Sequence, residues 1–294
     1  STGQYGTQAG RITMSVEHET DDEQLDSSVD ARGSSILSRL PLTEEQLISL
    51  GSPVMFVILW EATVQFGFLP EAWFPAPSSI FGTLIELIRN GTLVENTAIT
   101  LRRLLGAFLL AAVPGIVLGL IMGLNATFRA IMDPLVSMLY PIPKIALLPL
   151  IIIIFGFGDR SIIVTASITS FFIILLNTMA GVLEIDDVLL EAAENFHARG
   201  FQKFYKVVLP GAMPLIFTGL RLGLGLALIV TIAAEFIASE SGLGYFILNS
   251  WQILRVEYMF AGFIVIGVIG SLLTLGVEKL GDHLMPWRET DTIR

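Results

Sequence analysis

Long apolar stretches alternate with short polar segments along this chain. Six of the stretches approach the roughly 20 residues that a helix needs to cross a bilayer. The third contains Pro141, Pro143 and Pro149, and because each proline removes a backbone donor, we predict a broken helix there. The pattern predicts an all-α, polytopic membrane protein with six transmembrane helices, at about residues 48–68, 104–124, 131–157, 161–183, 211–237 and 258–278.

Small residues recur in the second stretch. Gly115, Gly119 and Gly123 follow one another at four-residue spacing, which lines them up on one face of a helix. Such a line lets another helix approach closely. We therefore expect this face to pack against another helix, either within the bundle or in a second copy of the chain.

Composition supports a membrane protein and argues against other classes. Hydrophobic residues make up 53% of the chain and charged residues only 15%, against about 25% charged in soluble domains. The formal net charge of −10 argues against a nucleic-acid partner. The chain has no cysteine, and His18, His197 and His283 lie far apart. We therefore expect neither a disulfide nor a metal site.

The chain divides into one membrane domain and two tails. Residues 1–45 hold nine acidic and three basic residues and too little apolar material to fold alone, so a disordered acidic tail is expected. Residues 1–13 precede Met14 and are set aside from the fold prediction as added or processed sequence. Residues 46–285 are expected to form the transmembrane domain, and 286–294 a C-terminal tail.

The distribution of Lys and Arg predicts the orientation. An even number of spans places both termini on the same side of the membrane. If this side is the cytoplasm, the inner segments hold ten Lys and Arg residues and the outer segments five. Because cytoplasmic loops carry the excess of positive charge, both tails and the segment after the fourth span are expected in the cytoplasm.

This segment, residues 184–206, is densely charged although it lies between two apolar spans. Such a load of charge is too costly to place in hydrocarbon. Leu189, Leu190, Ala193 and Phe196 nevertheless recur at spacings of three and four, which places them on one face of a short helix. The segment is therefore predicted to be a structured element outside the bilayer.

The boundaries of this element can also be predicted. Asp186 or Asp187 can cap the first helix at its start. A break is expected over 197–200, where Gly200 is free to take a positive φ, and a second short helix, FQKFYKVV, is expected to end at Leu209–Pro210. Two helices joined by a turn indicate either a docking element for a partner or a plain loop that re-enters the membrane.

The residues of this segment carry a resemblance to a known family. The run Glu191-Ala192-Ala193, with Leu209-Pro210 eighteen and nineteen residues later, resembles the EAA motif of permease subunits in bacterial ABC importers. The stretches DPLVSMLYPIPKIALLPLIIIIFGFGD, LPGAMPLIFTGLRLGLGLALI and AAEFIASESGLGYFI are similar to the nitrate/sulfonate/taurine/bicarbonate branch of this family. The resemblance implies the permease architecture of a type I ABC importer.

The resemblance also implies roles for residues 184–208. They would form the coupling loop, whose helix sits in a groove of a separate ATPase subunit. Glu191 would pair with a basic residue of the ATPase, while Ala192 and Ala193 would permit close packing. The family usually has glycine where this chain has His197, so either the turn is kept there or it moves by about three residues. The tip would comprise His197, Ala198, Arg199, Gly200 and Phe201.

The implied assembly supplies what this chain lacks. No phosphate-binding G-x-x-x-x-G-K-[ST] sequence and no Ser/His/Asp set occur in it, so no enzyme activity is expected and ATP with Mg would be bound by the partner ATPase. The resemblance implies a homodimer in a prokaryotic inner membrane, with ATP-binding subunits in the cytoplasm and a substrate-binding protein outside. Such systems import small anions or vitamin precursors.

Polar residues within the apolar stretches are candidates for the translocation pathway. Lys144, beside two prolines, is the candidate for attracting an anion, or else a snorkelling or ion-paired structural lysine. Asn177 would line the pathway or form a helix–helix hydrogen bond. Glu235 and Glu240, near the outer end of the fifth span, would take part in a gate or in a structural ion pair or cap.

Another class of protein is compatible with the six spans. A secondary transporter or a channel would move solute without ATP, and it would work without a partner ATPase. A membrane-embedded enzyme is less favoured, because the titratable residues in the spans are scattered rather than convergent.

Overall fold

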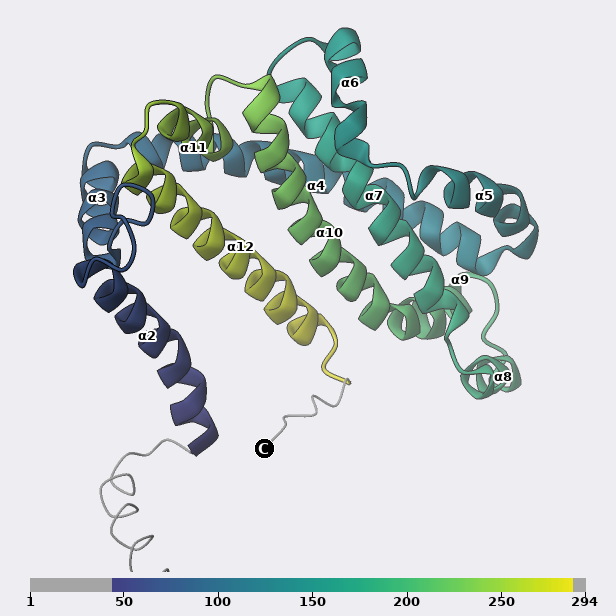
Figure 1. Cartoon of the computed structure of the whole chain (residues 1–294). Helices are drawn as coiled ribbons and strands as arrows, with labels where there is room; N and C mark the ends of the chain where they lie inside the picture. Colours follow the sequence, from purple (N-terminus) through teal and green to yellow (C-terminus); the bar gives the residue numbers. More distant parts are fainter. Residues whose placement is uncertain (1–43, 288–294) are drawn as a thin grey trace, which may run out of the picture. The chain divides into compact units, whose positions relative to one another are not determined.

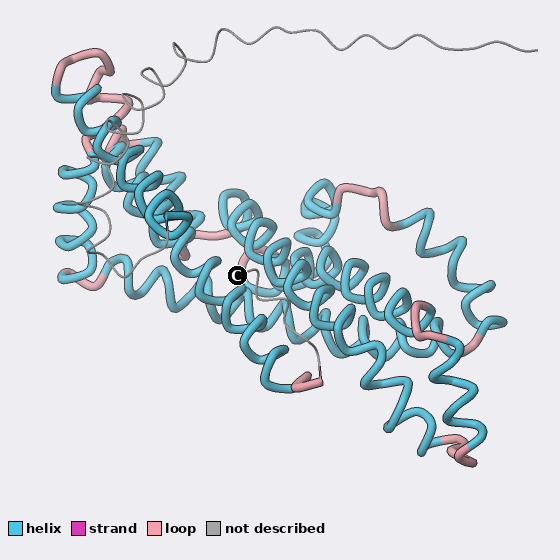
Figure 2. Tube along the Cα trace, turned by 90° about the horizontal axis from the view of Figure 1, so that it is seen from below, coloured by secondary structure: helices cyan, strands magenta, loops and turns pink. Residues whose placement is uncertain are grey.

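The computed structural model describes residues 44–287, and for residues 44–50 it describes the backbone alone. The chain forms two units, residues 1–59 and 60–294. Within the described residues the structure is helical throughout and has no strand (Figures 1 and 2). The elements are α2 (Glu44–Gln65), α3 (Pro77–Arg89), α4 (Thr92–Leu124), α5 (Ala126–Leu139), η1 (Lys144–Leu147), α6 (Leu148–Phe155), α7 (Asp159–Leu183), α8 (Asp187–Asn195), α9 (Phe201–Lys203), η2 (Phe204–Val208), α10 (Leu209–Ala238), α11 (Leu243–Gln252) and α12 (Val256–Leu284).

The first unit is described only for residues 44–59, which belong to α2. The predicted first span, about 48–68, falls mostly on this helix. Because the side chains of residues 48–50 are not described, the span stays a prediction. The predicted acidic tail lies outside the described residues except for its last two positions, and most of the predicted C-terminal tail also lies outside them.

Four helices in the second unit are long and apolar enough to cross a membrane. They are Thr92–Leu124, Asp159–Leu183, Phe201–Ala238 and Val256–Leu284. A fifth candidate is the pair Ala126–Leu139 and Lys144–Phe155, which bends by 80° at its break. This pair confirms the prediction of a proline-broken helix in the third apolar stretch. The all-helical prediction is thus confirmed, with four or five of the six spans identified.

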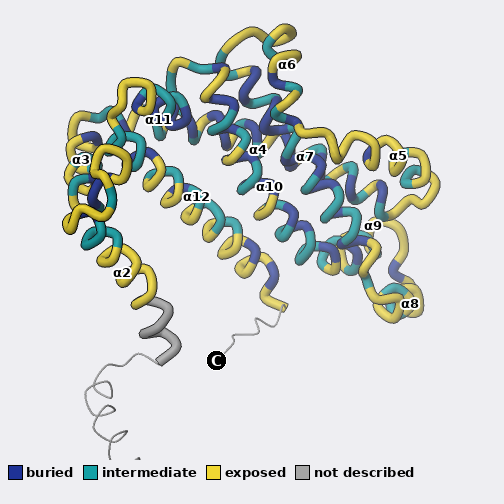
Figure 3. Tube along the Cα trace, viewed as in Figure 1, coloured by how far each residue is buried: buried dark blue, intermediate teal, exposed yellow. Residues whose placement is uncertain are grey.

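Helix α7 forms the centre of the packed bundle, because it packs along both α4 and α10. Figure 3 shows that buried residues concentrate on these three helices. A Cβ added at Gly119 would lie 2.6 Å from the Cβ of Thr178, and one at Gly123 would lie 2.5 Å from the Cβ of Val182. The predicted close approach of helices is therefore confirmed, and the partner is α7 of the same chain.

Two predicted helix boundaries are wrong. The second span begins at Thr92 rather than near residue 104, so Arg102 and Arg103 lie inside α4 and not in an outer loop. In the sequence these two arginines interrupt the apolar run, which is why the predicted span began after them. In the fold they form ion pairs with acidic residues of α7 and α10.

The second wrong boundary is at Leu209–Pro210, where the helix continues instead of ending. A proline inside an α-helix normally clashes with the carbonyl four residues earlier. Here η2 is a π-helix, and the Leu209 amide donates to the Phe204 carbonyl five residues back. This wider turn accommodates Pro210, so α9, η2 and α10 form one helix from Phe201 to Ala238.

The two ends of α10 lie at opposite faces of the bundle. Its 30 residues correspond to a length of about 45 Å, enough to cross a bilayer. The segment with α8 and α9 precedes its first residue, and α11 follows its last one (Figure 1). The segment around α8 and the segment around α11 therefore lie at opposite ends of this candidate span.

Candidate functional site

The charged segment contains the predicted short helix, α8, and the predicted turn, but the helix after the turn is the start of the longer helix that runs to Ala238. Helix α8 begins after Asp186, whose side chain accepts a hydrogen bond of 2.8 Å from the Val188 amide. This contact confirms Asp186 as the capping residue, because an N-cap carboxylate satisfies an amide that the helix leaves free. The segment is therefore a structured element and not a plain loop.

The turn at the end of α8 is built on His197, which has a φ of 59°. The His197 amide donates to the Glu194 carbonyl, and the Ala198 amide donates to the Ala193 carbonyl, both at 2.9 Å. This pair of hydrogen bonds defines a Schellman motif, in which the left-handed position is usually glycine. Histidine tolerates that geometry better than most residues. The turn therefore stays at His197 and does not move along the chain, and Gly200 adds a second positive φ of 55°.

The surface of this turn combines aromatic and charged side chains. Phe196 and Phe201 are 87% and 79% exposed, and the ring of Phe201 stacks on Tyr205 with centroids 6.3 Å apart. Glu191 and Arg199 are also exposed. Exposed aromatic groups of this kind are typical of a surface that a partner covers.

Two expectations for this helix need correction. Phe196 does not share one helix face with Ala193, because α8 ends at Asn195 and Phe196 is exposed while Ala193 is buried. Ala193 is covered by its own chain, so the exposed contacts available to a partner come from Glu191 and the turn. Sequence analysis missed the exposed Phe196 and Tyr205, since apolar spacing alone does not tell which side of a helix packs.

An ion pair ties α8 to the start of the following helix across the turn. The Nζ atom of Lys203 in α9 donates to Oε1 of Glu194 in α8 at 2.8 Å. This hydrogen bond, together with the positive charge of Lys203, lowers the pKa of Glu194 below its ordinary value of 4.5. The pair holds the turn closed in addition to the backbone hydrogen bonds.

Lys144 lies at the bend between α5 and α6. Its Nζ atom donates to the carbonyls of Leu139 and Tyr140, at 2.8 and 2.5 Å, and lies 4.7 Å from the centre of the Phe172 ring. The side chain is 8% exposed. These contacts place a positive charge at the C-terminal end of α5, where it stabilises the helix dipole and its free carbonyls.

Asn177 lies on α7 at the contact with α10. Its Nδ2 atom donates to the Ile173 carbonyl of its own helix at 2.8 Å, and its Cβ atom faces Gly219 of α10. The expected helix–helix hydrogen bond is therefore not present among the described contacts, because the side-chain amide bonds to its own helix. The contact with α10 is one of close packing.

Glu235 is completely buried and is the centre of a polar network between helices. Its carboxylate accepts hydrogen bonds from Thr100 at 3.0 Å and from the Gly244 amide at 2.8 Å. Arg103 donates to it at 2.8 Å and also bonds to Asp159 at the start of α7. A gate and a structural ion pair were the two predicted roles for Glu235, and the structure shows the ion pair.

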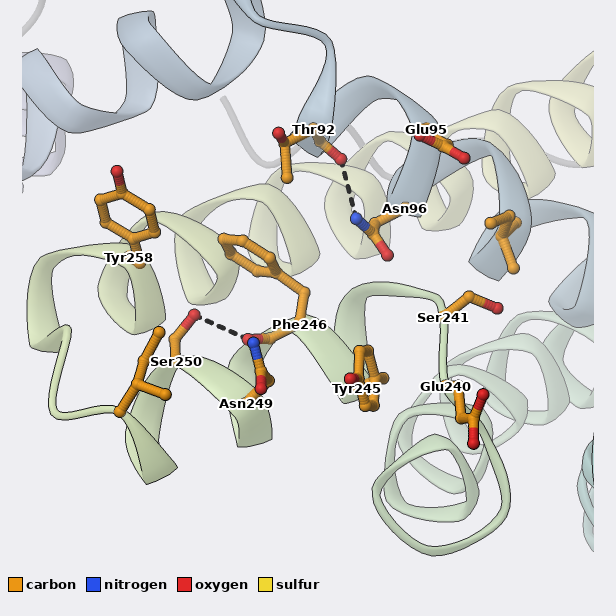
Figure 4. A pocket seen from close by; sticks show the side chains of 12 residues that line it. Thr92, Glu95, Asn96, Glu240, Ser241, Tyr245, Phe246, Asn249, Ser250 and Tyr258 are labelled. Atoms are coloured by element: carbon orange, nitrogen blue, oxygen red, sulfur yellow. Dashed lines mark hydrogen bonds between the residues drawn. The ribbon is translucent and has the colours of Figure 1, made fainter.

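Glu240 is not part of this network. It is exposed and lines a cavity of about 380 Å³ at the end of α10 (Figure 4). The structure thus separates Glu235 from Glu240, although the sequence placed them together. The cavity is lined by Thr92, Glu95, Asn96, Ile99, Glu240, Ser241, Tyr245, Phe246, Asn249, Ser250, Ile253 and Tyr258.

Sequence analysis missed this cavity and its second acid, Glu95. Its walls come from α4, the segment before α11, α11 itself and α12, which are distant in the chain. No spacing in the sequence could have found it. Within residues 44–287, no group of three His, Asp or Glu side chains could hold a metal ion.

Comparison with known proteins gives consistent matches over most of the chain. Residues 115–289 match the family described as "Binding-protein-dependent transport system inner membrane component". The chain is 35% identical to a putative ABC transporter permease protein of Methanocaldococcus jannaschii, over 84% of this chain and 94% of that protein. It is 33% identical to the taurine transport system permease protein of Escherichia coli, over 85% and 92% respectively. It is 32% identical to the bicarbonate transport system permease protein of Synechococcus elongatus, over 77% and 85%.

Solved structures show the same fold at lower identity. An amino acid ABC transporter with histidines matches with a TM-score of 0.54 and 18% identity, over 70% of this chain and 98% of that chain. The MetNI methionine ABC transporter, in an inward facing conformation, matches with a TM-score of 0.54 and 20% identity, over 66% and 95%. At these identities the likeness concerns the fold alone.

Proposed function

Because the chain belongs to the family of binding-protein-dependent transport system inner membrane components, we propose that it forms the translocation pathway of an ATP-driven importer and is driven through residues 184–208. The chain is a permease subunit and has no catalytic activity of its own. It is a multi-pass protein of the inner membrane. A separate ATPase binds the ATP and Mg that drive such a system.

The observation that carries this proposal is the exposed turn at the end of α8. It presents Glu191, Arg199 and Phe201 to solvent, and it is held by the motif at His197 and by the Glu194–Lys203 pair. A rigid, protruding element with exposed aromatic groups is suited to a groove on a partner protein. We propose that this partner is the ATPase, with Glu191 against a basic residue and the segment 197–201 at the centre of the contact.

The turn is continuous with a membrane-spanning helix. Because Phe201 begins the helix that ends at Ala238, displacement of the turn by the ATPase would displace α10 as well. We propose that this displacement changes the access of the pathway from one side of the membrane to the other. The permease then contributes two conformations, and its partners change the balance between them.

The proposed assembly contains two copies of this chain, with six spans each. The first span would comprise about residues 48–68, and both termini would lie in the cytoplasm. A single bundle offers only four or five candidate spans in the described residues, which is few to enclose a solute pathway. The bent pair α5 and α6 and the face with Asn177 would contribute to this pathway, with Lys144 holding the bend through the Leu139 and Tyr140 carbonyls.

The proposed substrate is a small anion. Relatives are named for the transport of taurine, aliphatic sulfonates and bicarbonate, all of which carry a negatively charged oxyanion group. We propose a solute with such a group for this chain, and a vitamin precursor is the alternative to include in an uptake screen.

Reconstitution tests the proposed function directly. The chain is co-expressed with its neighbouring genes, purified and inserted into liposomes, and uptake of labelled sulfonates and bicarbonate is measured. We expect co-purification of an ATPase and uptake that requires ATP. Uptake by the purified chain alone, without ATP, would overturn the proposal and favour a secondary transporter or channel.

Single cysteines test the orientation. The chain has no natural cysteine, so a cysteine at Glu191 or at Glu240 gives a labelling signal without background. With a thiol reagent that cannot cross the membrane, we expect labelling of intact cells at Glu240 and not at Glu191. The reverse result would place residues 184–208 outside and contradict contact with a cytoplasmic ATPase.

A further inference from the structure

The cavity at the end of α10 contains two acidic side chains that have no partner among the described residues. Glu95 on α4 and Glu240 before α11 are both exposed, and no hydrogen bond or ion pair joins either side chain to another described residue. Figure 4 shows them on two different segments of the cavity wall. A charge without an intramolecular partner costs little when it remains in water, and it is available to a partner of opposite charge.

Aromatic and amide groups complete the wall between the two acids. Tyr245 and Tyr258 contribute rings, and Asn249 contributes an amide. The ring of Tyr258 already takes part in a cation–π contact with Arg255, whose guanidinium carbon lies 4.9 Å from the ring centre, whereas among the described residues the ring of Tyr245 has no such contact. Carboxylates together with aromatic faces are the combination that binds guanidinium or ammonium groups. The chemistry of the cavity therefore favours a cation.

The backbone that carries Glu240 is fixed by hydrogen bonds. The Gly242 amide donates to Oδ1 of Asn96 at 2.8 Å, and the Ser241 carbonyl accepts from the buried Arg103 at 2.8 Å. Gly242 has a φ of 99° and lies directly against the Glu235 carboxylate, where a side chain would clash. The wall is thus preorganised, and only the exposed carboxylates are left free to adjust. Preorganisation reduces the ordering cost when a partner binds.

The position of the cavity indicates the kind of partner. It lies at the end of α10 that is opposite to the turn at His197, so the proposed function places it on the outer face. Its acids are exposed, whereas the polar groups of a small-molecule site converge on a ligand that is mostly buried. Exposed charges of one sign are typical of a surface that guides and orients a protein partner.

We propose that this cavity receives a Lys or Arg side chain of the substrate-binding protein, with Glu95 and Glu240 as its partners. The inference rests on the proposed function, because it requires that transport depends on such a protein. The cavity volume of about 380 Å³ is ample for one long basic side chain. Arg103 donates a hydrogen bond to the Ser241 carbonyl and forms an ion pair with Glu235 of α10. These two contacts link the docking cavity to the helix whose other end lies at the turn at His197.

The test uses the complete transporter in liposomes, with the purified binding protein of the same system added in increasing concentration. The measured quantity is the concentration that gives half-maximal stimulation of ATP hydrolysis. For the double variant Glu95→Gln, Glu240→Gln we expect this concentration to rise about tenfold, as for the loss of two exposed ion pairs. ATP hydrolysis without binding protein should be unchanged.

A matched control and a salt series make the test specific. Glu71→Gln removes an exposed acid that does not line the cavity, and it should leave the half-maximal concentration unchanged. The wild-type value should rise with salt, and the double variant should respond less, because screening acts on the charges that the variant lacks. The charge-reversed variant Glu95→Lys, Glu240→Lys should need a higher concentration of binding protein. If an acidic substitution in the binding protein brings this concentration back towards the wild-type value, the result supports the pairing directly.

The outcomes separate this inference from the proposed function. If the wild-type complex shows no ATP hydrolysis that the binding protein stimulates, the proposed function itself fails. If the wild type is stimulated and the double variant has the same half-maximal concentration and salt response, only the cavity inference is overturned. A variant that binds the protein normally but has an altered KM for a cationic solute would also overturn it, since the cavity would then hold free solute.

Discussion

The guanidinium group of Arg103 in α4 and the carboxylate of Glu235 in α10 form an ion pair of 2.8 Å, with side chains that are 3% and 0% exposed. These two residues are 132 positions apart in the chain. The pair fixes α4 against α10 and also holds the Ser241 segment. It is therefore a structural centre at the end of the bundle where the cavity lies.

Removal of one member of this pair should strongly destabilise the protein. Arg103→Ala leaves a buried carboxylate without its counter-charge, and we expect a loss of about 3–5 kcal/mol in unfolding free energy. Thermal unfolding of the purified protein measures the effect. Arg102→Ala is the matched control, because Arg102 is 68% exposed and, among the described residues, pairs only with Asp159, so its loss should cost less than about 1 kcal/mol. Equal effects of the two variants would contradict this role.

His197→Gly should stabilise the turn at the end of α8. Histidine at a φ of 59° carries a cost that glycine does not, although glycine also loosens the unfolded chain. We expect a net change within about 1 kcal/mol in favour of glycine. His197→Val should act in the opposite direction, because a β-branched residue is poorly accommodated at positive φ. Thermal unfolding and ATP-driven uptake of both variants check the prediction, and a more active valine variant would contradict it.

Gly119→Ala should separate α4 from α7. The added Cβ would lie 2.7 Å from the Leu175 carbonyl oxygen, which is backbone and cannot rotate away. We expect destabilisation of about 1–3 kcal/mol, the usual cost of overpacking. Gly276→Ala in α12 is the control, because nothing lies within 4 Å of its added Cβ and alanine favours the helix. Melting temperatures of the two variants should move in opposite directions.

The pair Glu194–Lys203 should make the turn sensitive to acid. Because the pKa of Glu194 is lowered in the folded protein, its contribution to stability is fully present above its ordinary pKa of about 4.5 and is lost as the pH falls through the lower, folded value. The difference in stability between wild type and Glu194→Gln should therefore be constant above pH 4.5 and shrink below it. A difference that grows on acidification would show that the carboxylate is not held by Lys203.

Lys144→Met tests the two roles considered for Lys144. If the lysine attracts an anionic solute, the KM for uptake should rise while the melting temperature is kept. The observed bonds to the Leu139 and Tyr140 carbonyls predict instead a lower melting temperature and an unchanged KM, because two helix-end carbonyls lose their donor. Lys279→Met, in the last turns of α12, is the control and should change neither quantity.

The sequence was sufficient for features that depend on local pattern. The apolar runs predicted both ends of α7 and the start of α12, which continues to Leu284 beyond the predicted end near 278. The prolines predicted the bend before α6, and Asp186 was one of the two residues predicted to cap α8. The sequence predicted that the turn either stays at His197 or moves by about three residues. The structure has a left-handed backbone at His197, so the turn stays there.

Features that depend on contacts between distant segments were not predictable in this way. Arg103 was assigned to a loop because a charge interrupts an apolar run, and only the fold reveals Glu235 and Asp159 beside it. Pro210 was read as a helix end because proline usually is one, and the π-turn that accommodates it has no clear signal in the sequence. Glu95 joins Glu240 only through the packing of α4 against α11.

The uninterrupted helix from Phe201 to Ala238 has a mechanical consequence. Its 38 residues form a rod of about 57 Å that carries an exposed aromatic ring at one end and the buried carboxylate of Glu235 close to the other. The π-turn over Phe204–Val208 and the prolines Pro210 and Pro214 lie near its first end, and such features are the usual places at which a helix bends. Movement of the turn at His197 therefore reaches the Glu235 end through this bend, which sets how much of it is transmitted.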